Sequence, residues 1–189
     1  MDIKVYHTVK DKGNPDYVEA NAPFKCTSDT AWMGHGYYLW DSDDLLAHWW
    51  GKRYQNDKYM ICECDAKIDE TCWDLHGNGN HLNEFRLICD ELIDNGITTK
   101  EKMLVAHVIE FFKKKRTFTY KAIRALSVFP NGLRTNIEEL NETIFFHPQN
   151  NAYMLMHPAI QICLINKNSL SLQNIRIIHP TEYTNEYFS

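Results

Sequence analysis

The hydrophobic and polar residues of this chain alternate as in β-strands near both ends and recur at helical spacing in the middle. Residues 2–9 alternate and are rich in branched and aromatic side chains, which predicts a first strand. Residues 10–29 contain Pro15 and Pro23 and predict an irregular connection. Similar patterns predict five further strands, at residues 36–40, 58–65, 144–146, 160–165 and 174–178.

Helices are predicted after the second strand and in the middle of the chain. The polar run at residues 41–44 offers hydroxyl and carboxylate groups that cap the free amides at the start of a helix. Residues 80–95 carry apolar side chains at helical spacing, and Gly96 then ends the pattern. Residues 98–101 resemble a capping box, which predicts another helix from there through Lys115. The helix after residue 44 would have four residues on one apolar face: Leu45, Leu46, Trp49 and Trp50.

Strands at both ends with helices between them predict a mixed α+β domain built on antiparallel sheets, because a doubly wound parallel sheet needs strands and helices in alternation. The chain has 189 residues, of which 44% are hydrophobic, and this is enough for one well-buried core. It contains no internal repeat, low-complexity tract or linker-like segment. We therefore expect a single domain spanning residues 1–189.

The net charge and the positions of the cysteines limit the possible partners and the cellular compartment. A formal net charge of −5 excludes a chain that coats nucleic acid or an anionic membrane as a whole. No stretch approaches the ~20 apolar residues that a membrane span needs, and the first residues lack the pattern of a secretory signal. Several of the six cysteines fall within apolar runs, which favours free thiols in a cytoplasmic protein over three disulfides in a secreted one. Export by a route without a signal stays open.

Three short segments carry the candidate chemistry: Tyr-His-Thr at residues 6–8, Gly-His-Gly-Tyr-Tyr-Leu-Trp at 34–40 and Ile-Gln-Ile-Cys at 160–163. Each combines a polar or reactive side chain with strand-like neighbours. In this order and spacing they resemble the ADP-ribosyltransferase superfamily, in which a His, a Tyr and a Glu or Gln from three strands hold the nicotinamide end of NAD. The resemblance implies catalytic roles for His7, Tyr38 and Gln161.

The resemblance also implies a fold and an activity. The fold would be ADP-ribosyltransferase-like: two packed, mostly antiparallel sheets that form an NAD cleft, with a helical insertion in the middle of the chain. The activity would be ADP-ribosyl transfer, with NAD as co-substrate and a protein or nucleic acid as acceptor. Such a protein would be a bacterial effector or toxin that acts without a membrane or a metal.

Breaking the bond between nicotinamide and ribose, whose transition state has oxocarbenium character, poses three tasks that residues of the first two segments suit. The ring of Tyr38 can stack on nicotinamide. The backbone at Gly34 and Gly36 lacks Cβ atoms and lets a ligand approach closely. His7 has two ring nitrogens with which to bind a ribose hydroxyl.

Two positions depart from the family pattern. Thr8 stands where the first motif usually has glycine. Gln161 stands where most transferases have glutamate, although some bacterial members carry glutamine there. Glutamine cannot act as a base, and its neutral hydrogen bonds are about half as strong as charged ones. The alternatives are therefore a catalytically inactive module that binds NAD, ADP-ribose or a protein, or an NAD glycohydrolase.

Other residues are weaker candidates for cofactor binding, metal binding or catalysis. Residues 120–124 resemble a segment of the same bacterial relatives, which makes Arg124 a candidate for cofactor binding, together with Thr8, Gly34, Gly36 and Tyr37. The basic run at 113–116 could bind the NAD pyrophosphate or a nucleic acid, but cations also suit the last turn of a helix, and we favour that interpretation. Cys62, Cys64, Cys72 and His76 could bind zinc, but core packing explains them better. Five carboxylates are candidates for a base: Asp41, Glu63, Asp65, Glu139 and Glu142.

Overall fold

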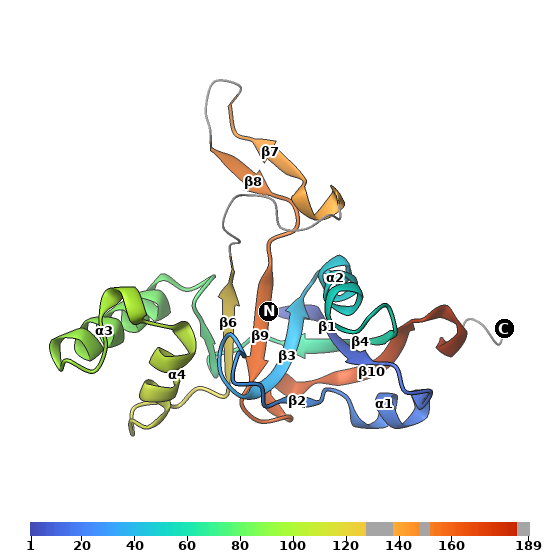
Figure 1. Ribbon diagram of the computed structural model, residues 1–189, viewed down its shortest axis with the longest axis horizontal. Helices are drawn as coiled ribbons and strands as arrows, with labels where there is room; N and C mark the ends of the chain where they lie inside the picture. The colour runs from blue at the N-terminus through green and yellow to red at the C-terminus, as the bar shows by residue number, and fades with distance from the viewer. Residues whose placement is uncertain (128–137, 148–151, 185–189) are drawn as a thin grey trace.

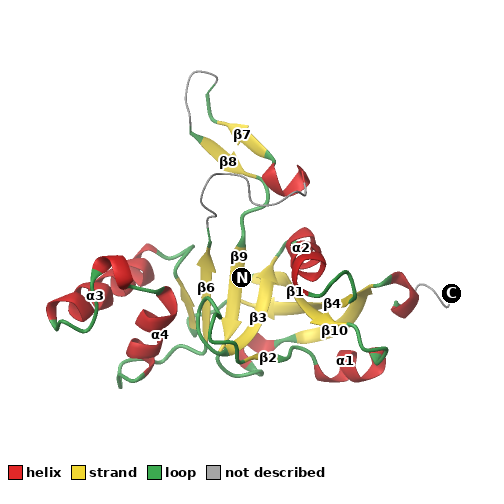
Figure 2. Cartoon of the chain, in the orientation of Figure 1, coloured by secondary structure: helices red, strands yellow, loops and turns green. Residues whose placement is uncertain are grey.

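The computed structural model describes residues 1–127, 138–147 and 152–184. These residues form one long mixed β-sheet with helices against it, and a two-stranded hairpin projects away from the sheet (Figures 1 and 2). The middle of the chain supplies two helices, α3 (Gly79–Asp94) and α4 (Val105–Lys113), which lie together beyond one end of the sheet. The α+β class is thereby confirmed.

The large sheet is mostly antiparallel. The pair β5–β6 is parallel, and the other neighbouring strands of this sheet run antiparallel. The expected two packed sheets are not found in the described residues, because strands from both ends of the chain pair into one continuous sheet. Its order is β10 (Gln173–His179), β4 (Tyr59–Lys67), β1 (Asp2–Lys10), β3 (Gly36–Asp41), β9 (Ile160–Leu164), β6 (Ala122–Leu126) and β5 (Cys72–Asp74), with β2 (Lys25–Cys26) paired to β3.

The predicted strands at residues 2–9, 36–40, 58–65, 160–165 and 174–178 correspond to β1, β3, β4, β9 and β10. The strand predicted at 144–146 is β7 (Thr143–Phe145), which pairs with β8 (Tyr153–Leu155) in the projecting hairpin. The predicted irregular connection contains a helix, α1 (Pro15–Asn21), so that prediction is wrong in part. Pro15 begins this helix because the first helical position needs no amide hydrogen.

The helix after the second strand is confirmed as α2 (Asp44–Tyr54), and the Asp43 carboxylate accepts a hydrogen bond from the Leu45 amide. The capping box at 98–101 is a wrong prediction. Residues Lys100–Lys102 form a single 3₁₀ turn, and Thr99 makes no side-chain cap. The chain is then extended at Met103, whose side chain packs against the core, and α4 begins later, at Val105.

The two faces of the sheet are covered by different elements. Directly opposite residues in an antiparallel pair lie on the same side, so Tyr38, Trp40, Gln161 and Cys163 share what we call the first face. Helix α2 packs on this face around Trp40, and α3 and α4 pack around Cys163. The second face carries the intervening residues, and its core includes Val5, Leu39, Ile162 and Leu164.

Candidate functional site

A cavity of about 830 Å³ opens on the first face. Its walls come from the loop between β2 and β3, the first turns of α4, the end of β6 and Gln161 of β9. This volume lies within the roughly 300–1,000 Å³ typical of small-molecule sites. Trp32 supplies an aromatic ring, while Lys25, Lys113 and Glu110 supply charges.

Gln161 contributes an unpaired polar group to the cavity wall. Its side chain is 6% exposed, between the cross-strand neighbours Trp40 and Ala125. The Oε1 atom is buried and accepts no hydrogen bond from the described part of the chain. A buried acceptor without a donor costs about 1–3 kcal/mol. The atom is closed to water in the unliganded chain, so a ligand donor would recover that energy once the side-chain amide turns towards the cavity.

Tyr38 lies behind the cavity and supports one of its walls. The hydroxyl donates to the Gly34 carbonyl at 2.7 Å and accepts from the Met33 amide at 2.8 Å. Burial raises the pKa of this hydroxyl above its usual value of 10.0, so the group stays protonated and keeps donating. Tyr38 therefore fixes the loop that carries Met33 and Gly34, both of which line the cavity.

Gly34 and Gly36, from the same segment, allow close approach to different neighbours. Gly34 has φ +83°, and a Cβ there would lie 2.8 Å from Glu110 Oε1, so glycine lets the loop approach α4. A Cβ on Gly36 would lie 2.3 Å from Cys163 Sγ and 2.7 Å from the Leu164 carbonyl oxygen. Gly36 is therefore required for packing against β9 and does not line the cavity.

His7 lies on the second face, away from the cavity. Tyr6 is directly opposite Trp40, so the next residue points to the other side of the sheet. The His7 Nδ1 donates to the Tyr38 carbonyl at 2.9 Å, and Nε2 accepts from the Phe24 amide at 3.1 Å. Burial lowers the pKa of His7 from 6.5 to about 4, so the ring is neutral with both nitrogens engaged.

This arrangement explains what His7 does in the fold. One edge of β3 pairs with β1 at Trp40 and with β2 at Tyr37, so the edge changes partner at Tyr38. The Tyr38 carbonyl at this change would lack a strand partner. The imidazole of His7 donates the missing hydrogen bond to this carbonyl. Because it also accepts from the Phe24 amide, the ring links β1 to the segment that leads into β2.

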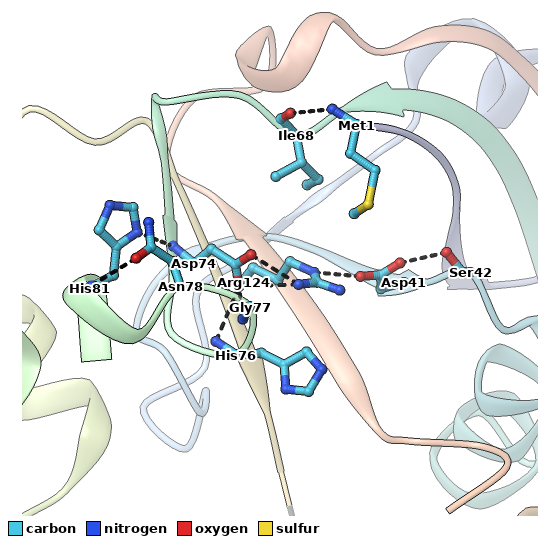
Figure 3. Close-up of polar contacts among 10 residues, drawn as sticks. All are labelled: Met1, Asp41, Ser42, Ile68, Asp74, His76, Gly77, Asn78, His81 and Arg124. Carbon is cyan, nitrogen blue, oxygen red and sulfur yellow. Dashed lines mark hydrogen bonds and ion pairs between the residues drawn. The ribbon is translucent and has the colours of Figure 1, made fainter. Parts of the chain in front are cut away.

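Thr8 and Arg124 are also engaged away from the cavity. The Thr8 hydroxyl donates to the Ala47 carbonyl of α2 at 2.9 Å. The buried Arg124 donates from Nε to Asp41 Oδ2 at 2.6 Å and from Nη1 to Asp74 Oδ2 at 3.0 Å, so it bridges two carboxylates on the second face (Figure 3). These ion pairs tie β3, β5 and β6 together.

The other predicted side chains have structural partners or lie apart. Glu63 pairs with Lys4 and Arg176, and Asp65 also pairs with Lys4. Glu142 is exposed beside the projecting hairpin, and the side chain of Glu139 lies outside the described part. Cys62, Cys64 and Cys72 are free thiols packed in the core.

Neither a metal centre nor a membrane-spanning helix is found among the described residues. No group of three or more His, Cys, Asp or Glu side chains there is arranged to hold a metal ion. Over the same residues, no helix combines the length and apolar character needed to cross a bilayer.

Sequence reasoning missed Glu110 and set Lys113 aside, although both line the cavity. Glu110 lines it from α4 and accepts a hydrogen bond from Lys113 at 2.6 Å. Lys113, the first residue of the basic run, thus lies in the last turn of a helix and at the cavity as well. The spacing of these two residues indicates a shared helix face, but nothing in the sequence tells which element that face meets.

The structure brings together only part of the predicted site within the described residues. Gln161 and Gly34 line the cavity, and Tyr38 holds its loop. The remaining predicted residues lie elsewhere: His7, Thr8, Gly36, Tyr37 and Arg124. No protein-family model, no curated protein and no solved structure matches this chain.

Proposed function

We propose that this chain is a nucleotide-binding α+β domain that takes NAD, or its ADP-ribose part, into the cavity. The single observation that carries the proposal is Gln161, a lining residue of the cavity whose buried Oε1 accepts no hydrogen bond from the described residues. The carboxamide of nicotinamide and the hydroxyls of ribose are donors that suit such an acceptor. Recovery of this hydrogen bond would favour the bound state.

The rest of the cavity wall fits the same class of ligand. Trp32 lines the cavity while its ring also packs against Trp40 and Trp50, and an aromatic side chain in this place is suited to contact a planar base. Lys25 offers an ammonium group for a pyrophosphate, while the ammonium of Lys113 is paired with Glu110. The wall also contains apolar side chains, among them Met33, Leu104 and Leu126, and such side chains are usual in a cofactor site.

The contacts of Tyr38 and His7 support ligand binding by the cavity more directly than they support a catalytic role for either residue. Tyr38 holds the loop of the cavity in place through its hydroxyl. His7 uses both ring nitrogens within the fold and has none left for a ribose hydroxyl. Binding therefore needs no rearrangement at either residue.

ADP-ribosyl transfer is the second candidate, and Glu110 is the observation that favours it. This carboxylate faces the cavity opposite Gly34, and its partner there is Lys113. A carboxylate beside the ribose can stabilise the oxocarbenium-like transition state or accept a proton from the acceptor. Glu110 thus supplies a negative charge that Gln161 cannot.

Calorimetric titration with NAD and with ADP-ribose tests the binding proposal. The wild-type chain should bind at least one of them, and Gln161→Met should weaken the affinity about tenfold because the ligand loses a buried acceptor. Gln173→Met is a matched control, since Gln173 is exposed on β10 and away from the cavity. Absence of nucleotide binding, or equal affinity in Gln161→Met, would refute the proposal.

Release of nicotinamide, followed by mass spectrometry, tests transfer separately. In that case Glu110→Gln should abolish release while leaving NAD affinity within a few-fold of wild type. Gln161→Glu should change the rate or the choice of acceptor. A wild-type chain that binds NAD without releasing nicotinamide would exclude transfer and leave the binding proposal standing.

A further inference from the structure

Helix α4 lies along the cavity, and the start of the helix is part of the wall. Leu104, Val105, Ala106 and His107 line the cavity there, and Lys113 lines it from the last turn. Leu104 and Lys113 are nine residues apart, which is about 13 Å along a helix axis. The first turn of α4 is therefore a part of the wall distinct from the end of the helix.

The start of α4 has free backbone amides. The first amides of any helix lack acceptors within it, and a side chain at the N-cap position usually supplies one. The N-cap here is Leu104, which has no side-chain acceptor, and the first turn contains no acidic residue. The amide of His107 already donates to the Leu104 carbonyl at 3.0 Å. The amides of Val105 and Ala106 have no acceptor in the described part of the chain.

These two amides favour a negatively charged ligand. The dipole of a helix places about half a positive charge at its N-terminus, where the free N–H groups point outwards. Glu110 lies five residues after Val105, about 7.5 Å along the axis, and Lys113 offsets its charge. Lys25 and Asp29 add one charge of each sign to the wall. The ionised side chains thus balance, and the start of α4 adds donors for an anion.

Gln161 independently indicates that the cavity holds a ligand. This side chain lines the cavity and is 6% exposed, and its Oε1 accepts no hydrogen bond from the described residues. Gln161 lacks a donor, whereas the amides of Val105 and Ala106 lack an acceptor. A ligand that satisfies both must carry hydrogen-bond donors and an anionic group in one molecule. A nucleotide does so through its hydroxyl or amide groups and its phosphates.

We propose that the uncapped N-terminus of α4 is a phosphate subsite of the cavity, in which the amides of Val105 and Ala106 donate to the pyrophosphate of a nucleotide. This inference rests on the proposed function and adds the place where the phosphates bind. Inorganic pyrophosphate is the simplest probe of the subsite. Nicotinamide riboside, which has no phosphate, does not use it.

Leu104→Asp tests the proposal, because the new carboxylate would cap the free amides and repel an anion. Calorimetric titration should show at least about tenfold weaker binding of inorganic pyrophosphate and of ADP-ribose. Affinity for nicotinamide riboside should stay close to that of the wild-type chain. The midpoint of thermal unfolding should rise by about 2–4 °C, because the helix gains a cap. A variant that merely disturbs the fold would lose both stability and affinity.

Two further variants are matched controls. Leu104→Ala removes the leucine side chain without adding a cap or a charge, so the affinity for pyrophosphate should stay near that of the wild-type chain. Asn78→Asp places the same charge at the N-cap of α3, where residue 78 already accepts hydrogen bonds and lies away from the cavity. This variant should also bind pyrophosphate as the wild-type chain does.

The outcomes separate this inference from the proposed function. Nucleotide binding that Leu104→Asp leaves unchanged would overturn the phosphate subsite alone, as would equal losses for ADP-ribose and nicotinamide riboside. A chain that binds pyrophosphate but no nucleotide, and loses pyrophosphate in Leu104→Asp, would support the subsite and refute the proposed function. A wild-type chain that binds neither pyrophosphate nor nucleotide would overturn both.

Discussion

At the scale of single residues, Gln161 combines an unfavourable position in the fold with a favourable one for a ligand. Its unpaired Oε1 costs free energy in the unliganded chain. Gln161→Met keeps the length of the side chain and removes the buried acceptor. The free energy of unfolding should stay equal or rise, by up to about 1–2 kcal/mol, as measured by urea denaturation. A decrease in the free energy of unfolding would instead mean that the glutamine amide supports the fold. Stability and ligand affinity would then both fall in this variant.

His7 predicts a dependence of stability on pH. Its pKa is lowered from 6.5 to about 4 in the folded chain, so between these values the unfolded chain binds a proton that the folded chain does not. Stability from this residue is therefore complete above pH 6.5 and falls as the pH decreases towards 4, by about 3 kcal/mol in total. Urea denaturation at a series of pH values would measure this slope.

His7→Gln provides the control for that measurement, because glutamine can donate and accept hydrogen bonds but does not titrate. The slope between pH 4 and 6.5 should be shallower in this variant. His48 and His179, whose pKa values burial also lowers, should leave part of the slope in place. Identical slopes in the two chains would show that His7 is not buried as a neutral ring.

Replacement of Gly36 by alanine should cause a steric clash, whereas replacement of Gly79 should not. Gly36→Ala would place a Cβ 2.3 Å from Cys163 Sγ and 2.7 Å from the Leu164 carbonyl oxygen, so β3 and β9 would have to separate. We expect a loss of about 3 kcal/mol or more in the free energy of unfolding. Gly79→Ala, with no atom within 4 Å of its Cβ, should be nearly neutral. Equal stability of both variants would contradict the close approach of the two strands.

At the scale of elements, the ion pairs of Arg124 join β3, β5 and β6. Arg124→Met would leave the Asp41 and Asp74 carboxylates without their cation, and we expect a loss of about 3–5 kcal/mol on urea denaturation. Lys4→Met, which breaks exposed pairs with Glu63 and Asp65, should lower the free energy of unfolding far less. If Arg124 binds the cofactor instead, Arg124→Lys should reduce NAD affinity, whereas the structural role predicts unchanged affinity.

The elements that the sequence predicts well are those whose pattern is long or whose ends are marked by local chemistry. β1 alternates over many residues, β4 begins with an apolar run and has nine residues, and Asp43 caps α2 as expected. β5 and β8 have three residues each, too few for a period to emerge. The capping box at 98–101 failed because Met103 is drawn into the core in an extended conformation, which local sequence does not encode.

At the scale of the whole molecule, strand register decides which predicted site residues can meet. Tyr38 and Gln161 share a face because the register of β3 and β9 puts Trp40 opposite Gln161. His7 falls on the other face because Tyr6 is opposite Trp40, and no local pattern fixes that register. Glu110 and Trp32 reach the cavity through packing between distant segments, so the sequence could not place them.

The origin of the cavity walls has a thermodynamic consequence. The walls come from loop 26–35, α4, β6 and β9. The first and the last of these segments are more than a hundred residues apart along the chain. No one of these segments forms the cavity alone, so an unfolded chain has no equivalent site. A ligand that fits the cavity must therefore stabilise the folded chain by mass action, by about 2.7 kcal/mol at a concentration one hundred times its dissociation constant. The midpoint of thermal unfolding thus measures occupancy whatever the chemistry of the ligand, and it can rank nucleotides by affinity.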